Sequence, residues 1–483
     1  MSTFEKQKEY IERLSNYIKT YRERNGRTLT YSVETFGCQM NFHDSERLEG
    51  ILEEAGFVKE SSDKADVIIF NTCTIRENAN QKLYGHLGTL KKRRLESGDM
   101  MICICGCMMQ EPTVIENIRK KYKYVDVVFG TFNIHKLAEL MVRHIETGEQ
   151  IIDVEKEAAE HVEDLPQKRK YSYKSGLNIM YGCNNFCTYC IVPYVRGRER
   201  SRIPEDILEE ARRLAGDGVK EIMLLGQNVN SYGANFYTDM ESGILKANPD
   251  YSFPELLADV CKIEGFERVR FMTSHPKDLS DKLIEVIAEN PKICRSVHLP
   301  VQSGSSEVLR RMNRKYTREH YMSLLKKIKD RIPDISVTSD IIVGFPGETE
   351  EDFRDTLTLV EEAGYDQVFT FIYSPRTGTP AASYPDKIDE DVIKDRFDRL
   401  LKTVNRTTNE RVKRFEGKTL PVLVEEIDKD IPGYVTGKTE YGTTVHFKAN
   451  ERLIGNIVPV LMKEHKGFYY MGEIVLQNEK EVD

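Results

Sequence analysis

The stretch GLNIMYGCNNFCTYC, residues 176–190, carries the strongest signal in this sequence of 483 residues. It begins as an apolar run typical of a buried strand and ends in a loop that holds Cys183, Cys187 and Cys190. Three thiolates in one loop can bind three corners of an iron–sulfur cube, and no fourth cysteine is nearby in sequence to close the fourth corner. The spacing differs from ferredoxin runs and from zinc sites built on paired C-x2-C. A zinc knuckle or a chance grouping is the alternative interpretation.

The same stretch opens an alternating series of strands and helices between about residues 170 and 400. Helical patterns separate six apolar runs of strand length, which are 176–181, 220–225, 268–273, 295–299, 336–343 and 367–373. Six consecutive βα units favour a barrel or a partial barrel over an open sheet. Glycine and polar residues follow the predicted strands, at the strand ends where barrel enzymes build their sites.

A second alternating pattern precedes this series, over residues 29–148. Its apolar runs predict four strands with helices between them, at 31–36, 66–70, 101–105 and 125–129. Buried runs joined by crossover helices indicate an open parallel sheet that is covered on both faces.

Three cysteines, Cys38, Cys73 and Cys107, follow the first three strands of this predicted sheet. Because the carboxyl ends of neighbouring parallel strands lie along one edge, we expect the three thiols to converge and to form a second three-cysteine site. Cys103 and Cys105 share one side of a predicted strand with Cys107, and buried cysteine is a common small apolar residue. We therefore expect Cys103 and Cys105 to belong to the core.

The remaining segments complete the predicted domain organisation. Residues 1–28 are predicted to form a polar extension with one amphipathic helix, 149–169 a charged linker, and 234–252 a surface insertion. Residues 402–476 contain five short alternating runs separated by turns, typical of a small five-stranded barrel of the kind that often binds oligonucleotides. Its candidate aromatics for stacking on RNA bases are Tyr434, Phe447 and Tyr469, although a purely structural barrel would carry aromatics too.

Composition sets further limits. The sequence has 70 Lys and Arg against 78 Asp and Glu, which gives a net charge of −8. This balance argues against a protein that coats a polyanion through its overall charge. No apolar run is long enough to cross a bilayer, and the charged start does not resemble a secretory signal. We therefore expect a cytoplasmic multidomain protein without membrane contact, in which clustered cysteines bind metal or carry out redox chemistry rather than form structural disulfides.

Several motifs together resemble one known family, the radical methylthiotransferases of the radical S-adenosylmethionine superfamily. They are FGCQMN at 36–41, NTCTIREN at 71–78, GCMMQ at 106–110 and CxxxCxxC at 183–190, followed by the small C-terminal barrel. The resemblance spans about residues 29–476. It implies a methylthiotransferase domain, a (βα)6 partial TIM-like radical core and a TRAM domain that resembles the OB fold.

The resemblance also implies the cofactors. An auxiliary 4Fe–4S cluster would be bound by Cys38, Cys73 and Cys107, and a second 4Fe–4S cluster by the CxxxCxxC cysteines, with S-adenosylmethionine at its open iron. In this family one S-adenosylmethionine methylates a sulfur associated with the auxiliary cluster, and another supplies the radical that removes a hydrogen. Five residues match positions expected to contact S-adenosylmethionine, namely Gly226, Gln227, Asn228, Ser274 and Gly344. No catalytic residue is predicted beyond the clusters.

The substrate branch is indicated by longer matches. TFGCQMN at 35–41, NTCTIRENANQKLYGHLG at 71–88 and CTYCIVPYVRGRERSR at 187–202 look like the branch that acts on N6-isopentenyladenosine beside the tRNA anticodon. The implied partners are a tRNA anticodon stem-loop and an external electron donor, and we expect a monomer. Arg196, Arg198 and Arg200 could bind tRNA phosphates, although a solvated arginine run is the alternative.

Two other kinds of function stay open at this stage. One is a methylthiotransferase for threonylcarbamoyladenosine in tRNA or for a ribosomal-protein aspartate. The other is a noncatalytic iron–sulfur protein that binds RNA or carries electrons, which ferredoxin spacing or a local fourth cysteine would favour; the sequence shows neither.

Overall fold

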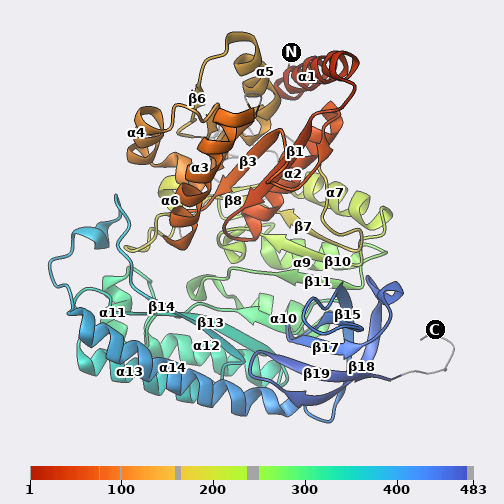
Figure 1. The fold of residues 1–483 in the computed structure, drawn as a ribbon. Coiled ribbons are helices and arrows are strands. Elements are labelled where there is room, and N and C mark those ends of the chain that lie inside the picture. Colours follow the sequence, from red (N-terminus) through yellow and green to blue (C-terminus); the bar gives the residue numbers. More distant parts are fainter. Residues whose placement is uncertain (1, 75–76, 98–99, 158–164, 237–249, 476–483) are drawn as a thin grey trace. The chain divides into compact units, whose positions relative to one another are not determined.

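The computed structural model describes residues 2–74, 77–97, 100–157, 165–236 and 250–475 (Figure 1). The chain forms two compact units. Unit 1 comprises Met1–Lys170, Tyr181–Asn184 and Ile191–Arg198, and unit 2 comprises Tyr171–Met180, Asn185–Cys190 and Glu199–Asp483. No helix of the described residues is long and apolar enough to span a membrane.

Unit 1 is built on a parallel sheet of six strands. Its order is β2-β1-β3-β4-β5-β6. The strands are β1 Thr30–Thr35, β2 Val58–Lys59, β3 Val67–Thr72, β4 Met101–Gly106, β5 Val127–Phe129 and β6 Ile151–Asp153. The four predicted strands are present. The linker predicted to begin at residue 149 is wrong at its start, because β6 pairs with β5 there; residues 158–164 of that linker lie outside the described part.

Helices cover both faces of this sheet and form two separate cores. One face carries α1 Thr3–Asn25, α2 Gln39–Ala55 and α5 Leu137–Thr147, and the other carries α3 Glu77–Ser97 and α4 Pro112–Lys121. The predicted N-terminal helix exists, and its Ile11, Leu14 and Ile18 are buried against the first core. It is therefore an integral part of unit 1 rather than a loose extension.

Unit 2 contains the six predicted βα units as two parallel three-stranded sheets, ordered β11-β10-β7 and β12-β13-β14. The strands are β7 Lys174–Asn178, β10 Glu221–Leu225, β11 Arg268–Phe271, β12 Ser296–His298, β13 Ser336–Val343 and β14 Gln367–Ile372. One continuous core lies under the helices α7 Pro204–Gly216, α9 Phe253–Lys262, α10 Asp281–Glu289, α11 Ser306–Arg311, α12 Arg318–Arg331, α13 Glu350–Ala363 and α14 Glu390–Val412. Short elements near the cysteine motif are β8 Met180–Tyr181, α6 Val192–Val195 and β9 Arg200–Ser201. Of the predicted insertion 234–252, residues 237–249 lie outside the described part.

The C-terminal segment of unit 2 forms the predicted five-stranded barrel, which is closed in the order β15-β16-β17-β19-β18. Its strands are β15 Thr419–Ile427, β16 Tyr434–Thr439, β17 Thr444–Lys448, β18 Ile457–His465 and β19 Tyr469–Ile474. Two buried arginines of β11 join it to the βα strands: Arg268 donates to the carbonyl oxygens of Pro421 and Lys438, and Arg270 to that of Thr439. Because these arginines satisfy backbone carbonyls across the junction, the barrel packs as part of unit 2.

Candidate functional site: two sets of three cysteines

The first set of cysteines lies at the carboxyl ends of three neighbouring strands in unit 1. Cys38 is the residue before α2 and follows β1, Cys73 follows β3 directly, and Cys107 begins a 3-10 turn directly after β4. Since β1 pairs with β3 and β3 pairs with β4, the three cysteines share one edge of the sheet. Ile75 and Arg76 of the motif around Cys73 lie outside the described residues.

Two glycines bring the outer loops close to Cys73. Gly37 has a φ of +136°, and a Cβ there would lie 2.8 Å from the Cβ of Cys73. Gly106 has a φ of +95°, and a Cβ there would lie 2.3 Å from the carbonyl oxygen of Thr72. Glycine is therefore required before both Cys38 and Cys107, because a side chain would push their loops away from the central strand end.

A buried amide network supports the same edge. The Asn71 amide donates to the backbone oxygen of Asn41 at 2.8 Å and to the hydroxyl of Ser45 at 3.0 Å. The Asn41 amide donates to the Thr72 carbonyl oxygen at 3.0 Å, and its own side-chain oxygen accepts from the Cys38 thiol at 3.3 Å. These asparagines hold the loops that carry the thiols, and neither was among the predicted site residues.

Arg196 occupies a different place from the one predicted. It is buried, its Nε donates to the Cys107 sulfur at 3.3 Å, and its Nη2 pairs with Asp44 at 2.9 Å. The prediction that Arg196 contacts tRNA phosphate is wrong for this structure, because its guanidinium is enclosed by protein partners. Arg198 is exposed and Arg200 is partly exposed, so both have solvent-facing surface for that role.

The donor set of unit 1 fits an iron–sulfur cluster. Burial raises the pKa of the Cys107 thiol to about 11, against the opposing charge of Arg196, so iron is needed to hold this thiol as thiolate near neutral pH. Within the described ranges no three Cys, His, Asp or Glu side chains surround a point where one ion could bind. Cluster ligands do not need such a point, because each thiolate binds a different iron of the cube.

Four other cysteines are buried and belong to neither set of three. Cys103 and Cys105 lie in the core beneath α1, α2 and α5, as the period-two pattern predicts, and burial raises the pKa of both thiols well above the ordinary value. Cys261 and Cys294 are also buried, and burial raises the pKa of each to about 11 and about 12. These four buried thiols are core residues, as expected of small apolar side chains.

The second set lies in the loop after β7 and β8. The chain passes between the units within this motif, so that Cys183 belongs to unit 1 and Cys187 and Cys190 belong to unit 2. The unit 2 part is held by one turn of the chain after α11. The Asn313 amide donates to the carbonyl oxygens of Asn185 and Phe186, and the Thr188 N–H donates to the Met312 carbonyl oxygen.

The residues expected to contact S-adenosylmethionine lie at strand ends, as predicted, but their side chains differ in availability. Gly226 follows β10, and a Cβ there would lie 2.5 Å from Met180 Cγ. The side chain of Asn228 is engaged within the protein, since its amide donates to Asp278 at 2.7 Å and its oxygen accepts the His275 N–H at 3.0 Å. Gly344 follows β13 with a φ of +76°, and its N–H donates to Glu348. Gln227 lies between Gly226 and Asn228 and is partly buried.

Three buried side chains at these strand ends carry polar atoms that have no hydrogen-bond partner among the described residues. They are both amide atoms of Asn178 at the end of β7, the hydroxyl of Ser274 and Nε2 of His275, both after β11. Burial and the charge of Arg314 lower the pKa of His275 to about 2, so the ring is neutral, and Nδ1 accepts a backbone N–H, which leaves the proton on Nε2. A polar cofactor fits here because buried unpaired groups cost free energy until a ligand satisfies them.

The small barrel offers fewer aromatic side chains than predicted. Phe447 is fully buried in the barrel core, so its predicted stacking on an RNA base is wrong. Tyr434 and Tyr469 are partly exposed, and Phe468, which the sequence analysis did not select, is 80% exposed.

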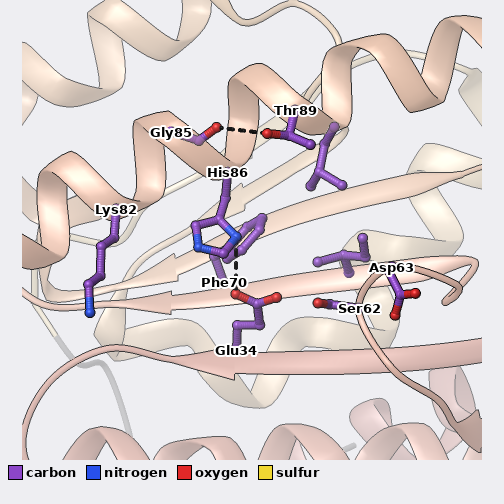
Figure 2. A pocket seen from close by; sticks show the side chains of 10 residues that line it. Glu34, Ser62, Asp63, Phe70, Lys82, Gly85, His86 and Thr89 are labelled. Atoms are coloured by element: carbon purple, nitrogen blue, oxygen red, sulfur yellow. Dashed lines mark hydrogen bonds and ion pairs between the residues drawn. The ribbon is translucent and has the colours of Figure 1, made fainter.

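Unit 1 also contains a cavity of about 470 Å³ between α3 and the strands β1 and β3. Figure 2 shows His86 and Glu34 directed toward each other in this cavity, with Lys82 farther along the helix. None of its ten lining residues is a cysteine, so it does not belong to the thiol sites.

Three family descriptions match successive parts of the chain. "Uncharacterized protein family UPF0004" matches residues 30–130, "Radical SAM superfamily" matches residues 177–360, and "TRAM domain" matches residues 413–475. The matched segments follow the sheet of unit 1, the βα strands of unit 2 and the closed barrel.

Curated relatives match over nearly the whole chain. The tRNA-2-methylthio-N(6)-dimethylallyladenosine synthase of Lachnoclostridium phytofermentans is 53% identical over 458 residues, covering 95% of this chain and 98% of the relative. The protein of the same name from Clostridioides difficile is 48% identical, covering 98% of this chain and 97% of the relative. Among solved structures, the radical S-adenosylmethionine methyltransferase TsrM from Kitasatospora setae is similar with a TM-score of 0.49 and 14% identity, over 74% of this chain and 77% of that one.

Proposed function

Because the chain belongs to the tRNA-2-methylthio-N(6)-dimethylallyladenosine synthase family, we propose that it converts N6-isopentenyladenosine to 2-methylthio-N6-isopentenyladenosine at position 37 of tRNA, next to the anticodon. The observation that carries this proposal is the pairing of two three-cysteine sets in one chain, one at a sheet edge and one in the loop of a radical S-adenosylmethionine domain. The cofactors are two 4Fe–4S clusters and S-adenosylmethionine.

Each cluster has its own protein ligands. Cys38, Cys73 and Cys107 hold the auxiliary cluster, and the three cysteines of the 183–190 loop hold the radical cluster. When bound, these groups and S-adenosylmethionine supply the sulfur, the methyl group and the radical that an unactivated aromatic C–H bond requires.

The protein's own residues bind, orient and exclude water. Gly37 and Gly106 keep the two outer cysteine loops against the central one, and burial at this edge protects the thiolates from solvent. In unit 2, Ser274 offers a hydroxyl and neutral His275 offers an N–H to the polar groups of S-adenosylmethionine, while Asn178 offers both an amide donor and an oxygen. Asn228 is a positioning residue, since it holds the His275 backbone.

The proposed partners are a tRNA anticodon stem-loop and an external electron donor. The exposed side chain of Arg198 and the partly exposed one of Arg200 would bind phosphate, and Tyr434 and Tyr469 of the barrel would stack on unpaired bases. We propose that the protein acts as a monomer.

Nucleoside mass spectrometry of tRNA tests the reaction and the substrate together. Cells that lack this chain should lose 2-methylthio-N6-isopentenyladenosine and accumulate the isopentenyl precursor, and the intact gene should restore the product. An unchanged nucleoside profile would overturn the substrate assignment. Threonylcarbamoyladenosine and ribosomal-protein peptides, measured in the same cells, would then identify the acceptor.

A further inference from the structure

Arg314 is a buried arginine that contacts the cysteine loop of unit 2. Only 5% of its surface is exposed, and its Nη1 donates to the Cys187 sulfur at 3.3 Å. Its other partners are neutral oxygens. Nε donates to the Tyr316 hydroxyl at 2.9 Å, and Nη2 donates to the Pro300 carbonyl oxygen at 2.8 Å.

This guanidinium has no carboxylate partner within the described residues. Most buried arginines of the chain do have one; Arg196 pairs with Asp44 and Arg396 pairs with Glu348. Burying a charge without a counter-charge costs several kcal/mol. Among the contacts that the described residues make with Arg314, the sulfur of Cys187 is the one proposed cluster ligand, and a thiol bound to iron is deprotonated outright.

The backbone on both sides of Arg314 is strained, and this conformation directs the Arg314 side chain toward the loop that carries Cys187. Asn313 and Lys315, on either side, both have left-handed φ values of 61° and 63°, which side-chain-bearing residues seldom adopt. Phe186, next to Cys187, is also left-handed with a φ of 46°. Strain of this kind persists where surrounding contacts enforce it, and here the Asn313 amide ties the turn to the Phe186 carbonyl oxygen.

We propose that Arg314 is a positioning residue that compensates the negative charge of the radical cluster through its hydrogen bond to Cys187. This inference rests on the proposed function for the identity of the cluster. A cation held against a ligand thiolate stabilises the reduced, more negative form of a cluster, so Arg314 raises the reduction potential. The easier reduction favours uptake of an electron from the external donor.

The test is an EPR-monitored redox titration of the full-length protein in which Cys38→Ala, Cys73→Ala and Cys107→Ala leave the radical cluster as the one signal. Arg314→Gln keeps polar donors but removes the charge. We expect its ratio of reduced to oxidised cluster at a fixed potential to fall at least tenfold, which is about 59 mV for one electron. Arg314→Lys, which keeps the charge, should stay closer to the parent protein.

Arg310→Gln is the matched control, since Arg310 lies four residues away, is exposed and pairs with Glu307. It should leave the potential unchanged. An unshifted Arg314→Gln variant, or equal shifts for Arg314→Gln and Arg314→Lys, would overturn the charge-compensation role. If Arg314→Gln does not load a cluster, Arg314→Lys decides between the two explanations. A reduction potential that falls by about 59 mV or more below that of the parent protein in Arg314→Lys, which keeps the charge, would show that Arg314 acts through its shape and would overturn the proposal.

Failure of the proposed function would look different. Cys187→Ala protein that still loads the radical cluster and cleaves S-adenosylmethionine would remove Cys187 from the ligand set, and the inference about Arg314 would fall with it. If the Cys187→Ala protein loses the cluster while Arg314→Gln keeps an unshifted potential, the function stands and the Arg314 inference fails.

Discussion

The two sets of three cysteines are assembled by different means. Cys183, Cys187 and Cys190 are close in sequence, so any compact loop keeps them near one another. Cys38, Cys73 and Cys107 are separated by 35 and 34 residues and meet because β1, β3 and β4 are neighbours in one parallel sheet. The first arrangement depends on a local turn, and the second depends on the correct folding of a whole sheet with glycines at two of its loops.

The arginines beside the two sets differ as well. Arg196 contacts Cys107 but is already paired with Asp44, so its charge is balanced before any cluster binds. Arg314 contacts Cys187 and has only neutral oxygens around it in the described part of the chain. Cluster loading should therefore change the local charge balance more around Cys187 than around Cys107.

The largest expected effect separates the roles of the two sets. Replacing any of Cys183, Cys187 or Cys190 by Ala should abolish formation of 5′-deoxyadenosine, because the radical cluster would lose a ligand. Cys38→Ala should keep this cleavage and lose thiomethylation of tRNA. Chromatography of the nucleoside products measures both reactions, and a fully active Cys38→Ala protein would refute the auxiliary-cluster assignment.

The next effect tests the charge balance around Cys107. Arg196→Gln leaves the Asp44 carboxylate buried without its partner, so we expect the free energy of unfolding to fall by about 3–5 kcal/mol. The double variant Arg196→Gln/Asp44→Asn should recover most of this loss. Urea unfolding of the apoproteins provides the comparison, and an equal loss in the single and double variants would show that shape rather than charge dominates.

A smaller effect concerns the backbone at the sheet edge. Gly106→Ala places a side chain on a residue with a positive φ of 95°, where its Cβ would meet the backbone of Thr72. We expect the free energy of unfolding to fall by about 3 kcal/mol. Iron analysis after reconstitution should show about half of the parent content, since the radical cluster does not depend on this loop. Gly148→Ala is the control; it also has a positive φ of 68° but an open surrounding, so it should cost about 1 kcal/mol and no iron.

The smallest effect tests which cysteines of β4 are ligands. Cys105→Ala removes a buried sulfur from the core and should cost about 1 kcal/mol, with full iron content and full activity. Cys107→Ala, two residues later, should lose the auxiliary cluster. A loss of iron in Cys105→Ala comparable to that in Cys107→Ala would contradict the division of this strand into core and ligand positions.

Much of this architecture could be read from local patterns. The period-two burial of β4 separates Ile102 and Ile104 from Cys103 and Cys105 on opposite faces, as the alternation predicts. Apolar runs located the longer strands of both units because burial on two faces demands continuous apolar sequence. The strand β2 was not predicted, since two residues are too few to show a period, and β6 was not predicted because its three residues begin a charged stretch.

The contacts around the thiols could not be read in this way. Arg196 stands in a run of exposed-looking arginines, and Arg314 in the polar sequence RMNRKY, yet both are buried on a cysteine. Asn178, Ser274 and His275 resemble ordinary turn residues at the ends of strands. Only the enclosure of each side chain by distant segments shows which polar groups lack partners.

The sequence by itself therefore determined the candidate ligands, the order of the βα units and the family, because these depend on residue type and spacing along the chain. The tertiary structure alone decided which arginine contacts which thiol and which buried polar atoms have no partner among the described residues. Charge balance and hydrogen-bond satisfaction depend on neighbours in space, and those neighbours lie far apart in sequence. Arg314 and Cys187 are 127 positions apart, and Arg196 and Asp44 are 152 positions apart.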